Sequence, residues 1–247
     1  MKSYGRGIVI SIVLLFGLVA CGTADPAPVD VVDTEAEVQE VPAEEHSDIE
    51  AVIEGEADPA QHADEIDAPE GATVFQLVEG ETEARFIINE VLRGEPKTVI
   101  GTTNAASGEI FINLDNLSAT KVGMISVEAG TLRTDSNFRN SAIQDFILQT
   151  GKYPQITFSP ASIEGIPVDV AVGDTITLEM TGDFTIREIT QKVTFTVNVT
   201  AESETAVRGF ASATVLRQDF DLTITSVPQV ASVEPEVVLE LDFLAAQ

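Results

Sequence analysis

The sequence predicts an all-β fold in which antiparallel strands enclose one apolar interior and a single α-helix is inserted among them. The strongest evidence lies between Thr175 and Ala201, where apolar and polar residues alternate in two runs separated by the five residues 187–191. Because successive side chains of a strand point to opposite faces, each run has one apolar and one polar face. Two such runs around a short connection predict a hairpin. No helix alternates with the strands, which disfavours a parallel sheet.

The other strands are predicted by the same alternation, starting near Thr73. Turn residues such as Gly94 and Gly130 separate them. In chain order, the expected strands cover residues 73–78, 84–92, 97–104, 108–114, 122–129, 156–163, 206–216, 219–225 and 236–243. The number and alternation of these strands fit both a closed antiparallel barrel and a sandwich, and periodicity alone does not choose between the two.

One segment has helical periodicity. Between Asp135 and Gly151, apolar residues recur at intervals of three and four, which places them on one face of a helix. These residues are Phe138, Ala142, Ile143, Phe146 and Ile147. Asp135 or Ser136 is placed to cap the first turn, and Gly151 suits the C-terminal cap. We therefore expect one helix between the strands.

The N-terminus has the features of a targeting segment. Two cations precede an apolar run from Gly7 to Val19, which is shorter than a membrane-spanning helix. The run ends in Leu18-Val19-Ala20-Cys21-Gly22, which resembles the signal of bacterial lipoproteins. We expect residues 1–20 to be a lipoprotein signal peptide and Cys21, the only cysteine of the chain, to be lipidated. The alternative is an ordinary secretory signal with an incidental cysteine.

Residues 21–72 are expected to hold the lipidated cysteine and a disordered acidic tether. Between Asp25 and Glu70 there are 17 aspartate and glutamate residues and no lysine or arginine. Such a segment repels itself and buries too little apolar surface to fold. Both histidines of the chain lie here, at a spacing that matches no known metal site. The tether would connect a folded domain, residues 73–247, to a bacterial membrane, on its periplasmic side or at the cell surface.

Charge and composition exclude several functions. The chain has a net charge of −28, and the part from Gly71 onward still has −13, so a nucleic-acid partner is not expected. The domain contains no cysteine and no histidine, which removes thiol chemistry, imidazole relays and typical zinc sites. We therefore expect no catalytic residue, no metal site and no cofactor, although a bound lipid would fit.

Four short motifs of the domain resemble those of the YceI-like family. They are Thr131-Leu132-Arg133-Thr134-Asp135 with Arg139-Asn140, then Lys152-Tyr153-Pro154-Gln155-Ile156-Thr157-Phe158, then Gly182-Asp183-Phe184-Thr185-Ile186 with Thr190 and Val193, and finally Arg217-Gln218-Asp219-Phe220. The resemblance covers residues 73–245. It implies a lipocalin-like antiparallel barrel of about eight strands with an apolar lumen. It also implies a polyisoprenoid ligand, such as a quinone or a polyprenyl lipid.

The chain departs from the family pattern at three places. Arg187 and Glu188 stand where family hairpins often have His-Gly, and Asp221 stands where glycine is usual. Asn89 and Glu90 stand where a histidine is common. Since the domain has no histidine, recognition of a ligand's head group by histidine does not carry over to this protein.

The predicted function is therefore that of a membrane-tethered lipid-binding protein, with the ligand held by apolar side chains. The candidate lining residues are Phe86, Ile88, Phe138, Phe146, Phe158, Phe184, Phe195, Phe210 and Phe220. The alternative is that these side chains fill a solid core, and that the domain is a surface interaction module for an unknown protein partner.

Overall fold

The structure, a computed structural model, describes residues 68–224 and 230–247, all of which belong to one compact unit, Ala57–Gln247. The predicted signal peptide, Cys21 and the tether up to residue 67 lie outside the described residues. None of the helices in the described ranges is long and apolar enough to cross a membrane.

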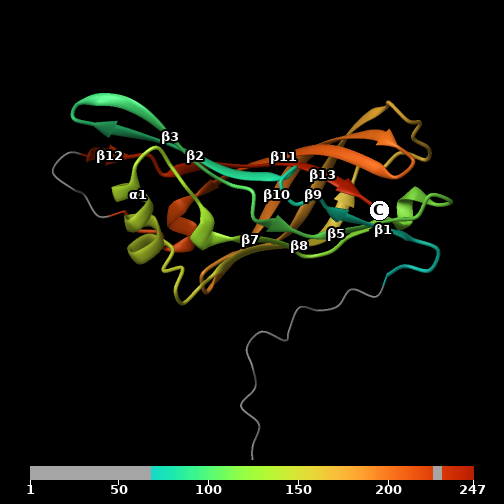
Figure 1. Cartoon of the computed structure of the whole chain (residues 1–247), viewed down its shortest axis with the longest axis horizontal. Coiled ribbons are helices and arrows are strands. Elements are labelled where there is room, and N and C mark those ends of the chain that lie inside the picture. Colours follow the sequence, from blue (N-terminus) through green and yellow to red (C-terminus); the bar gives the residue numbers. More distant parts are fainter. Residues whose placement is uncertain (1–67, 225–229) are drawn as a thin grey trace, which may run out of the picture. The chain divides into compact units, whose positions relative to one another are not determined.

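The described residues form one antiparallel sheet of thirteen strands (Figure 1). The strands are β1 (Thr73–Leu77), β2 (Glu83–Leu92), β3 (Glu95–Thr103), β4 (Ala106–Ser107), β5 (Glu109–Ile112), β6 (Lys121–Val122), β7 (Ile125–Glu128), β8 (Gln155–Glu164), β9 (Thr175–Ile186), β10 (Ile189–Ser203), β11 (Ala206–Leu216), β12 (Val230–Val233) and β13 (Glu236–Ala246). The helical segments are η1 (Leu117–Ala119), η2 (Ala129–Thr131), α1 (Asn137–Ala142), η3 (Ile143–Ile147) and η4 (Arg217–Phe220).

The sheet curls into a lipocalin-like half-barrel, which confirms the predicted fold class. Its long strands follow the order β8-β9-β10-β11-β13, and β13 pairs with β2 along one part of its length and with β1 along another. The two sides of the curled sheet are linked through the chain, because β4 pairs with β7 and only two residues separate β4 from β3. There are more strands than the sequence predicted because β4 and β12 were not predicted and the expected strand 122–129 is divided into β6 and β7.

The β9–β10 hairpin is longer than the sequence predicted. Ile186 pairs with Ile189, so the turn has two residues and the five-residue loop was wrong. Arg187 provides the positive φ of 58° at this turn. Beyond it, the hydroxyl groups of Thr185 and Thr190 lie 2.8 Å apart across the strands and extend the ladder. The apolar residues of both strands face the interior, as their alternation predicted.

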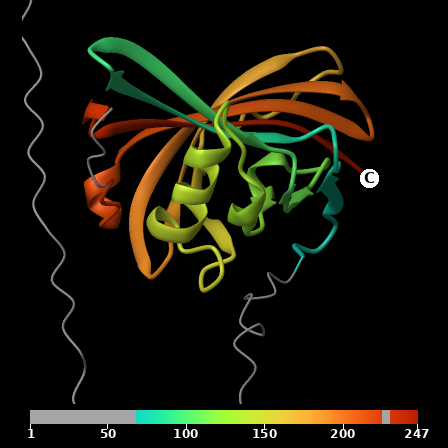
Figure 2. The ribbon, with the colours of Figure 1, turned by 60° about the vertical axis from the view of Figure 1, so that its left-hand side comes forward.

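The predicted helix is present as α1, and it continues into η3, a π-helical turn. Ser136 is the N-cap, and its hydroxyl accepts a hydrogen bond from the backbone N–H of Arg139. The expected cap at Gly151 was wrong, because the helical segment ends at Ile147, Leu148 is its C-cap and Gln149 adopts the positive φ of 52°. Figure 2 shows this helical segment beside the curled sheet.

The strand predicted at residues 219–225 was also wrong over its described part. Arg217–Phe220 forms the 3₁₀ turn η4, and Asp221 follows with a positive φ of 50°. The cause is tertiary: Phe220 is 1% exposed and packs edge-on against Phe184. The sequence did not predict β12, which pairs with β2.

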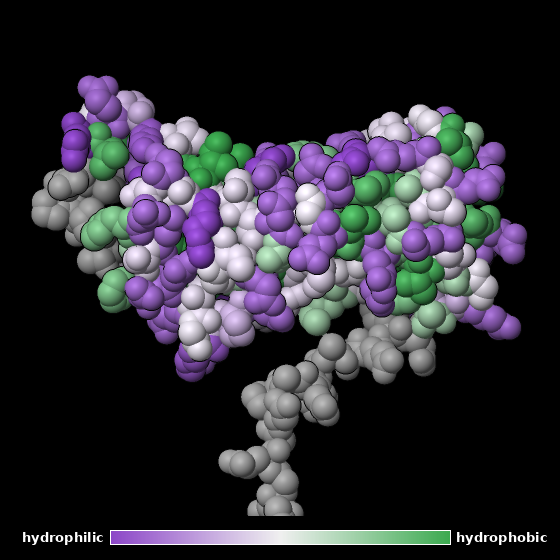
Figure 3. All heavy atoms as spheres, viewed as in Figure 1, coloured by the Kyte–Doolittle hydropathy of each residue, from purple (hydrophilic) through white to green (hydrophobic). Residues whose placement is uncertain are grey.

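The core lies on the concave side of the sheet. Every second residue of β9, β10, β11 and β13 is buried or half-buried there, and the intervening residues face outward. On the face seen in Figure 3, hydrophilic side chains are mixed with several hydrophobic patches.

Candidate functional site

Three cavities follow one another along the concave side of the sheet. The loop-end cavity has a volume of about 350 Å³, the central cavity about 160 Å³ and the helix-end cavity about 510 Å³. Neighbouring cavities share walls. The loop-end and central cavities share Ile110, Val122, Met180, Val197 and Phe243, whereas the central and helix-end cavities share Phe86, Leu132, Ile156 and Leu239. The three cavities therefore lie next to one another, and this row of mainly apolar cavities is called the lumen below.

The central cavity is the narrow part of this lumen, and aromatic rings form one wall. The ring of Phe195 lies edge-on to those of Phe158 and Phe184, with centroid distances of 4.9 and 6.0 Å. Edge-to-face contact is a preferred geometry of aromatic pairs and contributes about 0.5–1.5 kcal/mol per pair beyond the burial of area. Ala211, on β11, lines the same cavity with only a methyl group, which leaves room beside the rings.

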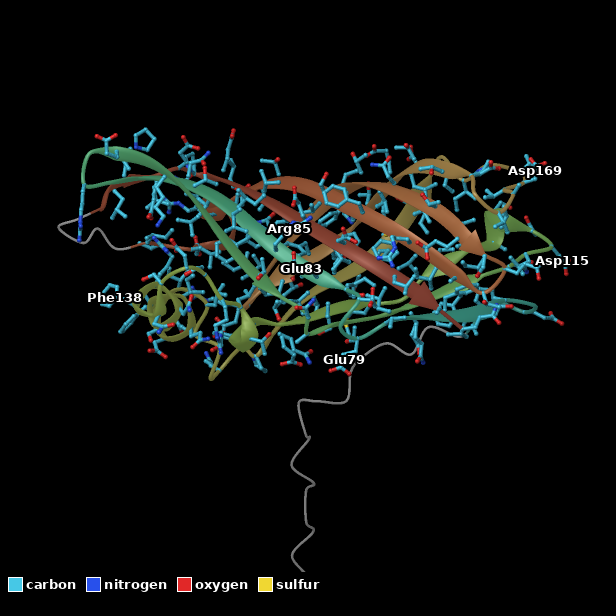
Figure 4. The ribbon with its side chains drawn as sticks, turned by 45° about the horizontal axis from the view of Figure 1, so that its top comes forward. Glu79, Glu83, Arg85, Asp115, Phe138 and Asp169 are labelled. Atoms are coloured by element: carbon cyan, nitrogen blue, oxygen red, sulfur yellow. The ribbon has the colours of Figure 1, made fainter. Side chains whose placement is uncertain are left out.

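Six of the candidate lining residues border the lumen. Phe158, Phe184 and Phe195 line the central cavity, and Phe86 lines both the central and helix-end cavities. Ile88 and Phe138 line the helix-end cavity. Phe138 is nevertheless 77% exposed and projects from α1 toward the outside (Figure 4). Phe138 therefore lies at the rim of the helix-end cavity and not inside it.

The structure does not place the other three candidates in the cavity walls. Phe146 is 76% exposed on η3, and Phe220 is packed behind Phe184. Phe210 points to the outer face of β11, where the guanidinium of Arg85 lies 5.8 Å from its ring centre. On either side of Phe210, Gly209 and Ala211 are buried and face inward. The ring of Phe243 occupies the space in front of Gly209.

Charged side chains gather at the helix-end cavity, which the sequence analysis missed. Its walls include Glu90, Arg93, Lys97, Asp135, Arg139 and Arg217. The alternation of β2 could have predicted the direction of Glu90. This residue is in phase with Phe86 and Ile88, so its side chain faces the lumen, and it is only 8% exposed. The position where a family histidine is common therefore carries an inward carboxylate.

A chain of ion pairs attaches α1 to the sheet at this cavity. Arg139 on α1 donates to the carboxylate of Glu90 at 2.8 Å and also to Asp135. Lys97 on β3 donates to the other oxygen of Asp135 at 2.6 Å. The hydrogen bond from Lys97, followed by the attraction of Arg139, lowers the pKa of Asp135 below its ordinary value. The carboxylate is therefore ionised at neutral pH.

The two ends of the lumen differ in chemistry. The loop-end cavity is bordered by loops that carry Asp115 and Asp169 at the far end from Phe138 (Figure 4). Its walls are apolar apart from a few hydroxyl groups and Glu204. Among the described residues, no three His, Cys, Asp or Glu side chains are arranged to hold a metal ion. The site is thus a long apolar lumen with one charged end.

Solved structures with the same fold were found by comparison. A polyisoprenoid binding domain from Saccharophagus degradans, implicated in plant cell wall breakdown, matches with a TM-score of 0.52 at 13% identity, over 70% of this chain and 97% of that one. BcnA from Burkholderia cenocepacia matches with a TM-score of 0.54 at 16% identity, over 69% of this chain and 99% of that one. At these identities the matches show the fold alone.

The sequence comparisons identify the family. No curated protein sequence matches this chain at a significant level. The sequence profile of the YceI-like domain, in contrast, matches residues 75–245, which is more than half of the chain and includes the whole lumen from β1 to β13. This protein therefore belongs to the YceI-like family, as its four motifs suggested.

Proposed function

We propose that this protein binds a polyisoprenoid chain in its lumen and carries or stores it. The observation that carries the proposal is the row of three cavities with shared apolar walls, which fits a long, flexible, apolar molecule. Family membership supports it, because the related domain from Saccharophagus degradans is described as polyisoprenoid binding. The proposed role is binding, without a chemical reaction.

The energetics favour such a ligand. Each CH₂ group that moves from water into an apolar wall contributes about 0.8 kcal/mol, so several isoprene units bind tightly without polar contacts. The loop-end and helix-end cavities each have volumes typical of ligand sites. The narrow central cavity suits one chain, and the rings of Phe158 and Phe195 would pack along it.

A bulkier residue in the central cavity is predicted to expel the ligand. Ala211 faces this cavity, and Ala211→Leu adds three heavy atoms where the lumen is narrowest. We expect the variant to fold with nearly unchanged stability but to lose most of its binding of added polyisoprenoid, measured by native mass spectrometry. Thr214→Leu is the matched control, because Thr214 is exposed on the outer face of the same strand.

The same variant tests the alternative of a solid core. If no ligand space exists, Ala211→Leu overpacks the core and costs about 1–3 kcal/mol, and the wild-type protein retains no lipid. That pair of results would leave the surface interaction module as the better account. If Ala211→Leu and Thr214→Leu both lost the lipid, the loss would not depend on the central cavity, and binding inside the lumen would not be supported.

We further propose that the protein acts outside the cytoplasm, anchored to a bacterial membrane through Cys21. The support is the lipoprotein-like signal that ends at Cys21, and the absence of another cysteine in the chain. Two or more acyl chains are needed for stable anchoring, and a lipidated N-terminal cysteine provides them. The tether from residue 22 to residue 72 would then connect the anchor to the β-domain.

The anchor has a direct test. Cells that express the full chain are fed a fatty-acid probe, and the wild-type protein is expected to become labelled and to partition with membranes. Cys21→Ser is expected to lose the label and to be released from, or retained differently in, the membrane fraction. An unlabelled wild-type protein would contradict the anchor without affecting the proposal for the lumen.

A further inference from the structure

The loop between β8 and β9 is unusually apolar for a surface connection. Its ten residues, 165–174, comprise six apolar residues, two glycines and two aspartates, and contain no lysine or arginine. Val168 is 95% exposed and Val172 is 60% exposed. Apolar side chains that gather on the surface of a domain mark a place where it contacts something other than water.

A second loop adds to this surface. Leu114, between β5 and η1, is 61% exposed, and it borders the same loop-end cavity as Val172. Pro167, which directly precedes Val168, borders this cavity as well. The three exposed residues Leu114, Val168 and Val172 are called the loop-end rim below. The rim thus lies directly beside the apolar wall of a cavity.

The rim is held in place by hydrogen bonds of its own loop. The carboxylate of Asp174 accepts a hydrogen bond from the backbone N–H of Ala171 at 2.9 Å. The N–H of Gly173 donates to the carbonyl of Ala201 on β10 at 2.8 Å, and the N–H of Ala201 donates back to the carbonyl of Asp174 at 3.1 Å. The exposed valines are therefore presented by an ordered loop.

The chain enters the domain beside this rim. The described residues begin at residue 68, and the side-chain amide of Asn113, next to Leu114, donates to the carbonyl of Glu70 at 3.2 Å. The 46 residues 22–67 connect this point to Cys21. The proposed membrane anchor is therefore attached to the same end of the domain as the rim.

The charge beside the rim indicates which membrane surface would fit. The two loops carry Asp115, Asp169 and Asp174, all exposed, and residues 113–116 contain no lysine or arginine either. Figure 4 shows Asp115 and Asp169 at the end of the domain opposite Phe138. Since like charges repel, these carboxylates disfavour an anionic lipid surface but not an electrically neutral, zwitterionic one.

We propose that the loop-end rim contacts a membrane surface of zwitterionic lipids, into which its three aliphatic side chains insert. This inference rests on the proposed function, because the anchor keeps the rim near a bilayer and the lumen would then open toward the lipid that supplies an apolar ligand. The contact is shallow, at the level of the headgroups, because the backbone of a loop needs hydrogen-bond partners that the hydrocarbon core lacks.

Vesicle flotation tests this contact. The chain from residue 21 onward is used with Cys21→Ser, so that neither the apolar N-terminal run nor an acyl chain can insert. We expect it to float with phosphatidylcholine vesicles, and to float several-fold less with phosphatidylglycerol vesicles at low salt. The difference is expected to shrink as the salt concentration rises, because exposed charges are screened. Tighter binding to phosphatidylglycerol would overturn the proposal.

Substitutions at Val168 assign the contact to the rim. Val168→Asn is expected to weaken vesicle binding about tenfold, because the burial of one valine side chain is lost. Val168→Phe is expected to strengthen vesicle binding, a gain that misfolding would not produce. Val168 lines none of the three cavities, so neither variant is expected to change polyisoprenoid binding.

Phe146→Asn is the matched control for Val168→Asn. Phe146 is 76% exposed on η3, at the helix end of the domain, and it also lines none of the three cavities. We expect this control to bind vesicles like the wild-type chain. An equal or larger loss in Phe146→Asn than in Val168→Asn would assign the contact to the helix end and overturn the proposal.

The remaining outcomes separate this inference from the proposed function. If the wild-type chain floats with neither kind of vesicle, the membrane contact is wrong, while polyisoprenoid binding, measured without vesicles, can still hold. If the chain floats but binds no polyisoprenoid, the rim stands and the proposed function of the lumen fails. If ultracentrifugation shows a dimer that Val168→Asn dissociates, a second copy of the chain covers the rim and the membrane contact is overturned.

Discussion

Replacing Gly182 by alanine is expected to destabilise the domain by about 3 kcal/mol, near the upper end of what overpacking costs. Gly182 lies inside β9 and is paired with Pro160 of the neighbouring strand β8, which has a bulge between Pro160 and Ser162. A Cβ atom at position 182 would press on the carbonyl oxygen of Ser159 and lie 2.7 Å from the Cα atom of Pro160. These are backbone atoms, so the clash cannot be relieved by a rotamer change. Far-ultraviolet circular dichroism during urea unfolding measures the loss.

Gly151→Ala is the control for Gly182→Ala. Gly151 is exposed, it does not need a positive φ, and no atom lies within 4 Å of the place that the methyl group of an alanine would take. The control is therefore expected to change stability by less than about 1 kcal/mol, in the stabilising direction if at all. Equal stability of both variants would mean that β8 and β9 do not approach each other as closely as described.

Replacing Arg139 by methionine is expected to cost about 3 kcal/mol. Arg139 is the partner of Glu90, whose carboxylate faces the lumen and is almost fully buried. Without the guanidinium, this charge stays buried without compensation, which is the costly way to break an ion pair. The double variant Glu90→Leu with Arg139→Met is expected to recover most of the loss, because no unpaired charge remains. Urea unfolding of the single and double variants measures both effects.

Lys192→Met is the control for Arg139→Met. Lys192 pairs with Asp183 at 3.0 Å, but both side chains are more than half exposed, so the loss is expected to stay below about 1 kcal/mol. If Arg139→Met lowered stability as little as Lys192→Met, the carboxylate of Glu90 would have to be solvated. That result would contradict its burial in the wall of the helix-end cavity.

The local elements were predictable because they follow from periodicity. The alternation on both sides of the central hairpin determines which faces of β9 and β10 are buried, and the spacing of Phe138 and Ala142 predicted α1. The alternation of β2 also predicts that Glu90 points inward. Its role as the ion-pair partner of Arg139 was not predictable in this way, because Arg139 lies 49 residues later in the chain.

What could not be predicted depends on contacts between distant segments. The turn η4 replaces a predicted strand because Phe220 packs behind Phe184 and Arg217 binds carbonyl groups beyond it. The size of an aromatic residue was a poor guide to the lumen. Phe210 is large, but it is out of phase with the inward residues of β11. Its neighbour Gly209 faces inward instead, and the ring of Phe243 on β13 occupies the space in front of this glycine.

Photo-crosslinking tests the central claim, a polyisoprenoid chain inside the lumen, most directly. A polyisoprenoid with a diazirine in its chain is bound to the full-length protein and irradiated, and the adducts are located by peptide mass spectrometry. We predict adducts on inward residues such as Met180 and Val197, which border both the loop-end and central cavities. Adducts confined to the exposed Phe146 or to Phe210 on the outer face would contradict the account.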